Sequence, residues 1–171
     1  MPVTYFRHEP WTEVTYLDEV AESPTVVQAA YDHPMAQMRT LFDSTFQAIF
    51  PALDELGLRP VGPAFSLHYR IPRETCDLEV GVPVDRALAA PLSTDTGVTI
   101  TPSVLPAGRI AVVTHLGSYA DLGDAWGRFM NQIAADGYQP VFPFWELYVT
   151  EPTQDTDSAT LRTDLVTRVA A

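Results

Sequence analysis

The sequence has no lysine, a single cysteine and no long apolar run, and each shortage excludes a class of protein. Ten arginines are set against 22 acidic residues, which gives a formal net charge of −12 at pH 7. Without clustered positive charge, neither direct nucleic-acid binding nor binding to anionic membrane surfaces is expected. Cys76 cannot form an internal disulfide, which fits a reducing cytoplasm. No segment approaches the roughly 18 apolar residues of a membrane span, and Met1–Trp11 does not resemble a secretion signal.

Motifs for cofactors are also missing. No pair of histidines or cysteines has metal-ligand spacing, so no metal site is expected. The chain contains no phosphate-binding loop and no nucleophile elbow, so no cofactor is expected and no catalytic residue is assigned by motif. Its length of 171 residues fits one domain.

Short apolar runs separated by turn signals predict strands throughout the chain. An Ala, Pro, Ser and Thr-rich stretch over 85–97 is the best linker candidate. The predicted strands span residues 13–20, 25–31, 65–71, 77–84, 98–104, 109–115, 144–150 and 161–169.

Two stretches have the apolar spacing of helices instead. The first spans Met35–Leu56, where Pro51 is expected to kink or split the helix and Gly57 to end it. The second spans about 119–136, with Ser118 as its N-cap.

The two halves of the chain repeat each other. The repeated units are residues 13–84 and 98–169, each with the order strand, strand, helix, strand, strand. This order predicts an α+β fold in which helices cover one face of an antiparallel sheet. A pseudo-twofold axis between the units would leave a groove, which is a common place for a ligand. Five identities carry the repeat, with Gly57, Pro60, Val61, Pro63 and Leu67 aligned to Gly137, Pro140, Val141, Pro143 and Leu147.

Glu146 is the most informative residue, because it interrupts an apolar, aromatic strand. A carboxylate buried without a partner is costly, so its position requires an explanation. Alternation along the strand places Phe144, Glu146 and Tyr148 on one face, predicted to line the groove. In the first half the same rule places Ser66, His68 and Arg70 on the groove face. The apolar residues of the opposite face are predicted to pack under the helices. They are Trp145, Leu147 and Val149 in the second half and Phe65, Leu67 and Tyr69 in the first.

Four segments together resemble the GyrI-like small-molecule-binding domain. They are residues 114–128 and 137–148 in the second half and 57–63 and 77–84 in the first. The resemblance covers nearly the whole chain and implies two SH2-like β-α-β-β units around a central groove. It also implies a buried Glu that meets lipophilic cations, and Glu146 falls at that position. The family includes effector-binding domains of AraC-type and MerR-type transcription regulators as well as stand-alone proteins.

Together, residues and resemblance predict a stand-alone cytoplasmic domain that binds a small, hydrophobic, cationic molecule. Glu146 would anchor the charge, with Phe144, Tyr148, Trp126 and His68 as walls. Aromatic walls and one carboxylate suit such a ligand by apolar burial, cation–π attraction and charge.

Two alternatives remain open. In the first, Glu146 acts as acid and base in a hydrolase of strained or electrophilic small molecules, an activity known in some family members. In the second, the acidic surface docks on a protein partner, as the family's gyrase-inhibitory member would suggest. The sequence favours a binding protein over an enzyme, and an enzyme of this kind would be a hydrolase of small electrophilic toxins.

Overall fold

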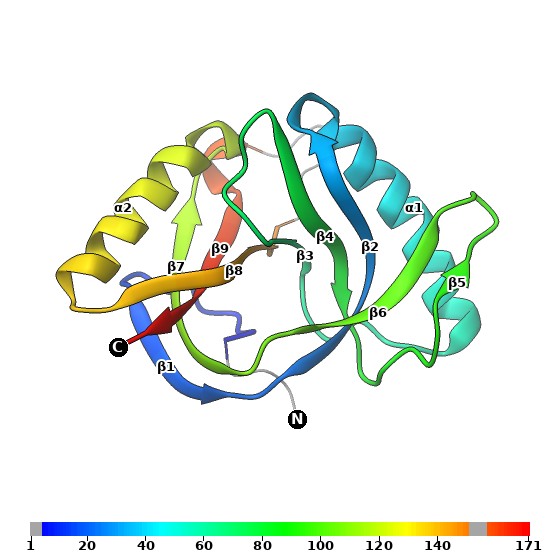
Figure 1. Cartoon of the computed structure of the whole chain (residues 1–171), viewed down its shortest axis with the longest axis horizontal. Helices are drawn as coiled ribbons and strands as arrows, with labels where there is room; N and C mark the ends of the chain where they lie inside the picture. The colour runs from blue at the N-terminus through cyan, green and yellow to red at the C-terminus, as the bar shows by residue number, and fades with distance from the viewer. Residues whose placement is uncertain (1–4, 151–156) are drawn as a thin grey trace.

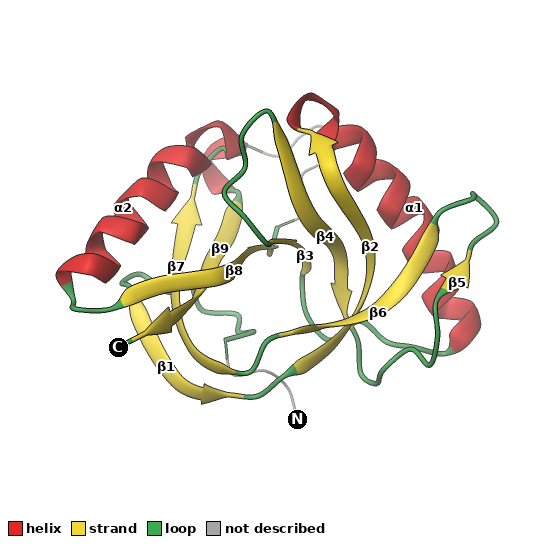
Figure 2. Ribbon diagram, in the orientation of Figure 1, coloured by secondary structure: helices red, strands yellow, loops and turns green. Residues whose placement is uncertain are grey.

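The computed structural model describes residues 5–150 and 157–171. Within them the chain folds as α+β, with nine strands in one antiparallel sheet and two helices, which confirms the predicted fold class (Figures 1 and 2). Across the sheet the strands run in the order β1-β7-β9-β8-β3-β4-β2-β6-β5. The strands are β1 (Thr15–Val20), β2 (Ser23–Pro34), β3 (Ala64–His68), β4 (Thr75–Pro83), β5 (Leu92–Ser93), β6 (Thr99–Leu105), β7 (Gly108–Leu116), β8 (Gln139–Tyr148) and β9 (Arg162–Ala170).

Both helices pack on the same face of this sheet and leave its middle uncovered. Helix α1 (Met38–Leu56) contacts β2 and β4, whereas α2 (Leu122–Ala135) contacts β7 and β8. Figure 1 shows the two helices at opposite ends of the molecule, with the central strands β8 and β3 between them. Three short 3-10 turns complete the elements, namely η1 (Met35–Gln37), η2 (Tyr119–Asp121) and η3 (Ser158–Thr160).

The strands that precede each helix cross from one half of the molecule to the other. Strand β1 pairs with β7, and β2, which follows it in the chain, pairs with β6 and β4. Likewise β6 pairs with β2, and the following strand β7 pairs with β1 and β9. The two halves therefore exchange their first strands, and β3 and β8 close the sheet between them.

The sheet face away from the helices carries the largest hydrophobic cluster. Phe65, Leu67, Trp145 and Leu147 are fully buried there, together with Tyr5 from the N-terminal segment. The prediction that this apolar face packs under the helices is therefore wrong. The physical reason lies in residues 5–11, an irregular segment that covers the face and takes the place the helices were expected to fill.

Under the helices, the sheet contributes smaller apolar side chains. Helix α2 buries Ala125, Phe129 and Ile133 against β7 and β9. Helix α1 buries Leu41, Ile49 and other residues in two clusters on β4 and β2. Full burial of one such side chain contributes roughly 1.5–3 kcal/mol, so these contacts fix both helices as walls of the space between them.

Two sequence-based boundaries differ from the structure. Strand β8 begins at Gln139, five residues before its predicted start at 144, because Pro143 falls in a register shift between Val141 and Phe144. A bulge accepts proline because no ladder hydrogen bond is needed there. Within 85–97, predicted to be a linker, residues 92–93 form the short β5.

The helices bear on two further predictions. Helix α1 continues through Pro51, so a split is excluded there and a kink stays a prediction; Pro51 lies on the exposed side, where water can satisfy the freed carbonyl. Gly57 ends α1 in the left-handed conformation, as predicted. The expected N-cap bond of Ser118 is absent, because its hydroxyl donates to the Asp121 carboxylate at 3.2 Å and α2 starts only at Leu122.

Candidate functional site

A groove of about 710 Å³ lies between the two helices, over the centre of the sheet. Its floor comes from the groove-facing residues of β3 and β8, its walls from α2 on one side and from η1 and the start of α1 on the other. Volumes of 300–1,000 Å³ are usual for small-molecule sites. All five residues predicted as ligand contacts line it, namely Glu146, Tyr148, Phe144, Trp126 and His68.

Glu146 is half-buried in this groove rather than fully buried as predicted. Its two oxygens each accept a hydrogen bond, from Trp126 Nε1 at 2.6 Å and from the Tyr148 hydroxyl at 2.7 Å. Trp126 reaches it from α2, and Tyr148 lies two residues further along β8. Two donors aimed at the carboxylate match its ionised form, which only accepts hydrogen bonds.

The polar contacts continue from Tyr148 across to β3. Ser66 Oγ lies 2.8 Å from the Tyr148 hydroxyl and 3.2 Å from His68 Nε2. Since Tyr148 donates to Glu146, Ser66 donates to Tyr148 and accepts from His68 Nε2–H. The chain of donors therefore runs from His68 through Ser66 and Tyr148 to Glu146, which fixes the carboxylate before any ligand arrives.

Burial sets the charge of the groove. It lowers the pKa of His68 to about 4, so that ring is neutral near pH 7. It raises the pKa of Tyr148 well above its ordinary value, and the Glu146 charge raises it further. For Tyr119, burial and then Glu146 raise the pKa. No arginine lines the groove among the described residues, so no cationic side chain accompanies Glu146 there.

Aromatic rings surround the carboxylate on several sides. His68 stacks on Phe144 with ring centroids 5.2 Å apart, and Trp126 meets Phe144 at 4.8 Å. Tyr148 contacts Phe42 at 5.6 Å and Tyr119 at 6.0 Å between centroids. The result is a mostly apolar groove in which, among the described residues, Glu146 is the one acidic side chain.

Several groove residues were missed by sequence reasoning. Met35 and Met38 line it from the start of the first helical region, and Ile71 from the loop after β3. Gly123 and Gly127 line it from α2. Helical periodicity places Gly123, Trp126 and Gly127 on one side of α2, but nothing in the sequence alone shows that this side faces open space.

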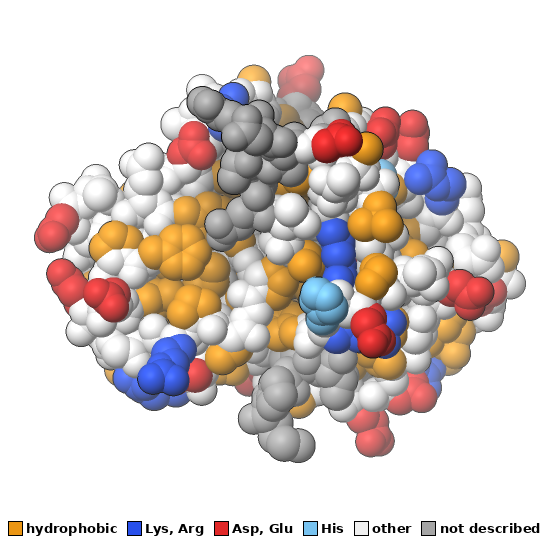
Figure 3. All heavy atoms as spheres, turned by 180° about the vertical axis from the view of Figure 1, so that it is seen from behind, with side chains coloured by type: hydrophobic (Ala, Val, Ile, Leu, Met, Phe, Trp, Pro, Cys, Tyr) orange, Lys and Arg blue, Asp and Glu red, His pale blue; other side chains and the backbone are white. Residues whose placement is uncertain are grey.

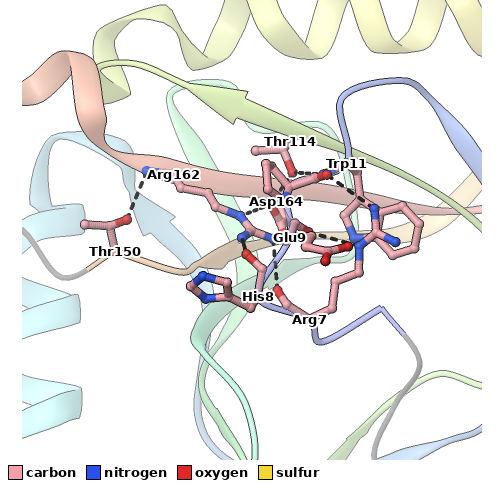
Figure 4. A network of polar contacts seen from close by, with 9 residues as sticks. Arg7, His8, Glu9, Trp11, Thr114, Thr150, Arg162 and Asp164 are labelled. Atoms are coloured by element: carbon pink, nitrogen blue, oxygen red, sulfur yellow. Dashed lines mark hydrogen bonds and ion pairs between the residues drawn. The ribbon is translucent and has the colours of Figure 1, made fainter.

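A buried ion pair on the opposite face anchors the N-terminal segment (Figure 4). Arg162 Nη2 lies 2.9 Å from an Asp164 oxygen, and both side chains are buried. The same guanidinium donates to backbone carbonyls of Arg7, His8 and Glu9. This network secures the segment that covers the Trp145 face, and so supports the sheet from behind the groove.

The other surfaces of the described residues carry fewer features of a binding site. A second cavity of about 520 Å³ lies on the far side of α2, where His115 Nε2–H donates to the Ser118 carbonyl at 3.1 Å, a structural contact. The part of the chain that the structure describes holds no group of three potential metal ligands. None of its helices is long and apolar enough to cross a membrane. Seen from behind, its basic side chains are scattered among acidic and hydrophobic ones (Figure 3).

An antiparallel sheet with two helices on one face and an apolar groove between them is an arrangement typical of small-molecule sites. The sequence profile of the GyrI-like small molecule binding domain matches residues 25–170. The chain therefore belongs to the GyrI-like family.

Solved structures with the same fold have low sequence identity to this chain. The C-terminal domain of EcmrR matches with a TM-score of 0.71 and 20% identity, over 92% of this chain and 97% of that one. A hydrolase from Listeria innocua matches with a TM-score of 0.65 and 11% identity, over 95% and 94%. SAV2435 bound to tetraphenylphosphonium matches with a TM-score of 0.58 and 16% identity, over 93% and 94%. No curated protein sequence matches the chain.

Proposed function

We propose that the groove binds a small lipophilic cation, with Glu146 as its electrostatic anchor. One observation carries this proposal: among the described residues that line the groove, Glu146 is the one acid, and no arginine accompanies it. His68, the remaining basic group, is neutral near pH 7 because burial lowers its pKa to about 4. The proposal places this binding in the cytoplasm, which the single free Cys76 favours.

The walls suit a cation that carries apolar groups. Phe144, Trp126 and Tyr148 line the groove, and each good cation–π contact with such a ring contributes about 0.5–2 kcal/mol. The groove also removes apolar surface from water, at about 25 cal/mol per Å². Glu146 adds attraction that is stronger in this half-buried site than it would be in bulk water.

The relatives support the ligand class. SAV2435, which has the same fold, has been solved bound to tetraphenylphosphonium, a cation whose charge is enclosed by four phenyl rings. Its identity to this chain is 16%, so the ligand is carried over only as part of the proposal.

A pair of matched probes tests the proposal. Methyltriphenylphosphonium is titrated into the wild-type protein by calorimetry, with neutral triphenylphosphine oxide, which carries the same three phenyl rings, as the control. We expect saturable binding of the cation and at least tenfold weaker binding of the neutral probe, since only the cation gains from Glu146. Equal affinities would show that the groove selects for ring content alone and would overturn the proposal.

A hydrolase is the second candidate, favoured by the chain of polar groups that ends at Glu146 and by the fold shared with the Listeria innocua hydrolase. In that case Glu146 would take the proton of an attacking water, and the Tyr148 hydroxyl would stabilise negative charge on the substrate. Turnover of epoxide or ester substrates that is lost in Glu146→Gln would support it. If neither epoxides nor esters are turned over, the hydrolase function is rejected.

A further inference from the structure

Helix α2 contains two glycines, Gly123 and Gly127, one turn apart on the side that lines the groove. Each costs the helix roughly 0.5–1 kcal/mol relative to alanine. Helix α1, on the other wall, contains no glycine. Two positions of α2 therefore lower the stability of the helix, and the reason must lie in the surroundings that these positions face.

Neither backbone conformation nor packing requires these glycines. A Cβ added at Gly123 or at Gly127 would meet no heavy atom within 4 Å, and neither residue adopts a positive φ. Gly81 shows the contrast, because a Cβ there would come within 2.0 Å of the Val26 carbonyl oxygen. The two α2 glycines thus border open space that the protein itself leaves unfilled.

The opposite side of the groove points to a ligand that would fill this space. At the rim, Met35, Ile71 and Phe142 are 37%, 64% and 45% exposed although they are apolar. A single aromatic ring over Glu146 would leave these rim side chains in water, whereas a larger ligand would cover them.

We propose that Gly123 and Gly127 hold the α2 wall open and thereby select a multi-ring cation over a single-ring ammonium. The inference rests on the proposed function of the groove as a cation site. In the bound state one ring lies against the bare helix backbone at Gly127, while others reach Phe142 and Ile71 across the groove. The groove volume of about 710 Å³ has room for such a ligand.

The test uses two cations and one pair of variants in the full chain. Affinities for tetraphenylphosphonium and for benzyltrimethylammonium, which has one ring, are measured by calorimetry into the millimolar range. Gly127→Leu fills the open space, and Asn131→Leu places the same side chain at an exposed position of α2 outside the groove. Melting temperatures are recorded in parallel, and Gly127→Leu should not melt lower than wild type because leucine favours the helix.

We expect Gly127→Leu to weaken tetraphenylphosphonium at least tenfold and to change benzyltrimethylammonium less than threefold, with both probes unchanged in Asn131→Leu. Gly123→Ala/Gly127→Ala should weaken the large probe by a smaller factor while raising the melting temperature. Equal losses for both probes, or no loss for either, would overturn the role of the glycines. Failure of wild type to bind either cation would instead reject the proposed function itself.

Discussion

Ser66 on β3 and Glu146 on β8 are directly opposite each other at the middle of the sheet. The repeat predicted from the sequence gives these two residues the same position in the two halves of the chain. That shared position falls where the halves meet, so two carboxylates there would be cross-strand neighbours and would repel each other. A serine opposite a glutamate leaves one charge in the groove and supplies a hydroxyl to hold it through Tyr148.

Replacing Ser66 by alanine should lower the free energy of unfolding by about 1–3 kcal/mol, because Tyr148 and His68 both lose a buried partner. Urea titration measures the loss. Ser93→Ala, on the exposed β5, is the control and should change stability by less than about 0.5 kcal/mol. A Ser66→Ala protein as stable as wild type would show that the donor chain does not contribute to stability.

His68 should make the protein less stable in mild acid. Its pKa is about 4 in the folded protein and 6.5 in a free side chain, so the unfolded state binds more protons between these values. The contribution of His68 to the free energy of unfolding is therefore fully present above about pH 6.5. It is lost as the pH drops towards 4, by up to about 3 kcal/mol. His68→Gln removes this contribution, so its stability should fall less than that of wild type between pH 7.5 and pH 4.5. Parallel curves for the two proteins would contradict the burial effect.

Ligand binding should be visible in the fluorescence of Trp126. Of the three tryptophans, Trp11 and Trp145 are buried on the other face of the sheet, whereas Trp126 lines the groove. Adding tetraphenylphosphonium should change the emission of wild type and of Trp11→Phe but not that of Trp126→Phe. Calorimetry should still detect binding to Trp126→Phe, weakened several-fold by loss of the indole donor to Glu146. A response that persists in Trp126→Phe would place the cation elsewhere.

The ion pair behind the groove should be essential for stability. Arg162→Met leaves Asp164 buried without its cation, which costs about 3–5 kcal/mol in comparable sites, and also frees the backbone of residues 7–9. Urea titration of this variant is compared with Arg73→Met, whose arginine is exposed. Arg162→Met/Asp164→Leu should recover part of the loss. A stability of Arg162→Met within about 1 kcal/mol of wild type would contradict this assignment.

The sequence was sufficient for the fold class, for most elements and for the groove face of β8. Strand alternation placed Glu146 beside Phe144 and Tyr148, and in the first half it placed Ser66 and His68 on the same groove face. It also placed Arg70 there, which is wrong, because Arg70 does not line the groove and pairs with Asp77 instead. Local patterns succeed here because period-two burial and the helix-ending Gly57 are properties of short segments.

Long-range packing accounts for what the sequence did not show. The apolar face of Trp145 is covered by residues 5–11 rather than by helices, a contact between segments far apart in the chain. That contact depends on Arg162, whose pairing with Asp164 has no local signal beyond two charges on one strand. The open wall at Gly127 was equally hidden, because glycine in a helix has no sequence signature of what it faces.

The most direct test of the account is the affinity of Glu146→Gln for tetraphenylphosphonium, measured by calorimetry at pH 7.5. Glutamine keeps the shape of the side chain and an acceptor for Trp126, but removes the charge. Glu22→Gln, exposed and outside the groove, makes the same change of net charge and is the control. We predict affinity weaker by about 10- to 100-fold in Glu146→Gln and unchanged in Glu22→Gln. Wild-type affinity in Glu146→Gln would contradict the central claim that this carboxylate anchors a cation.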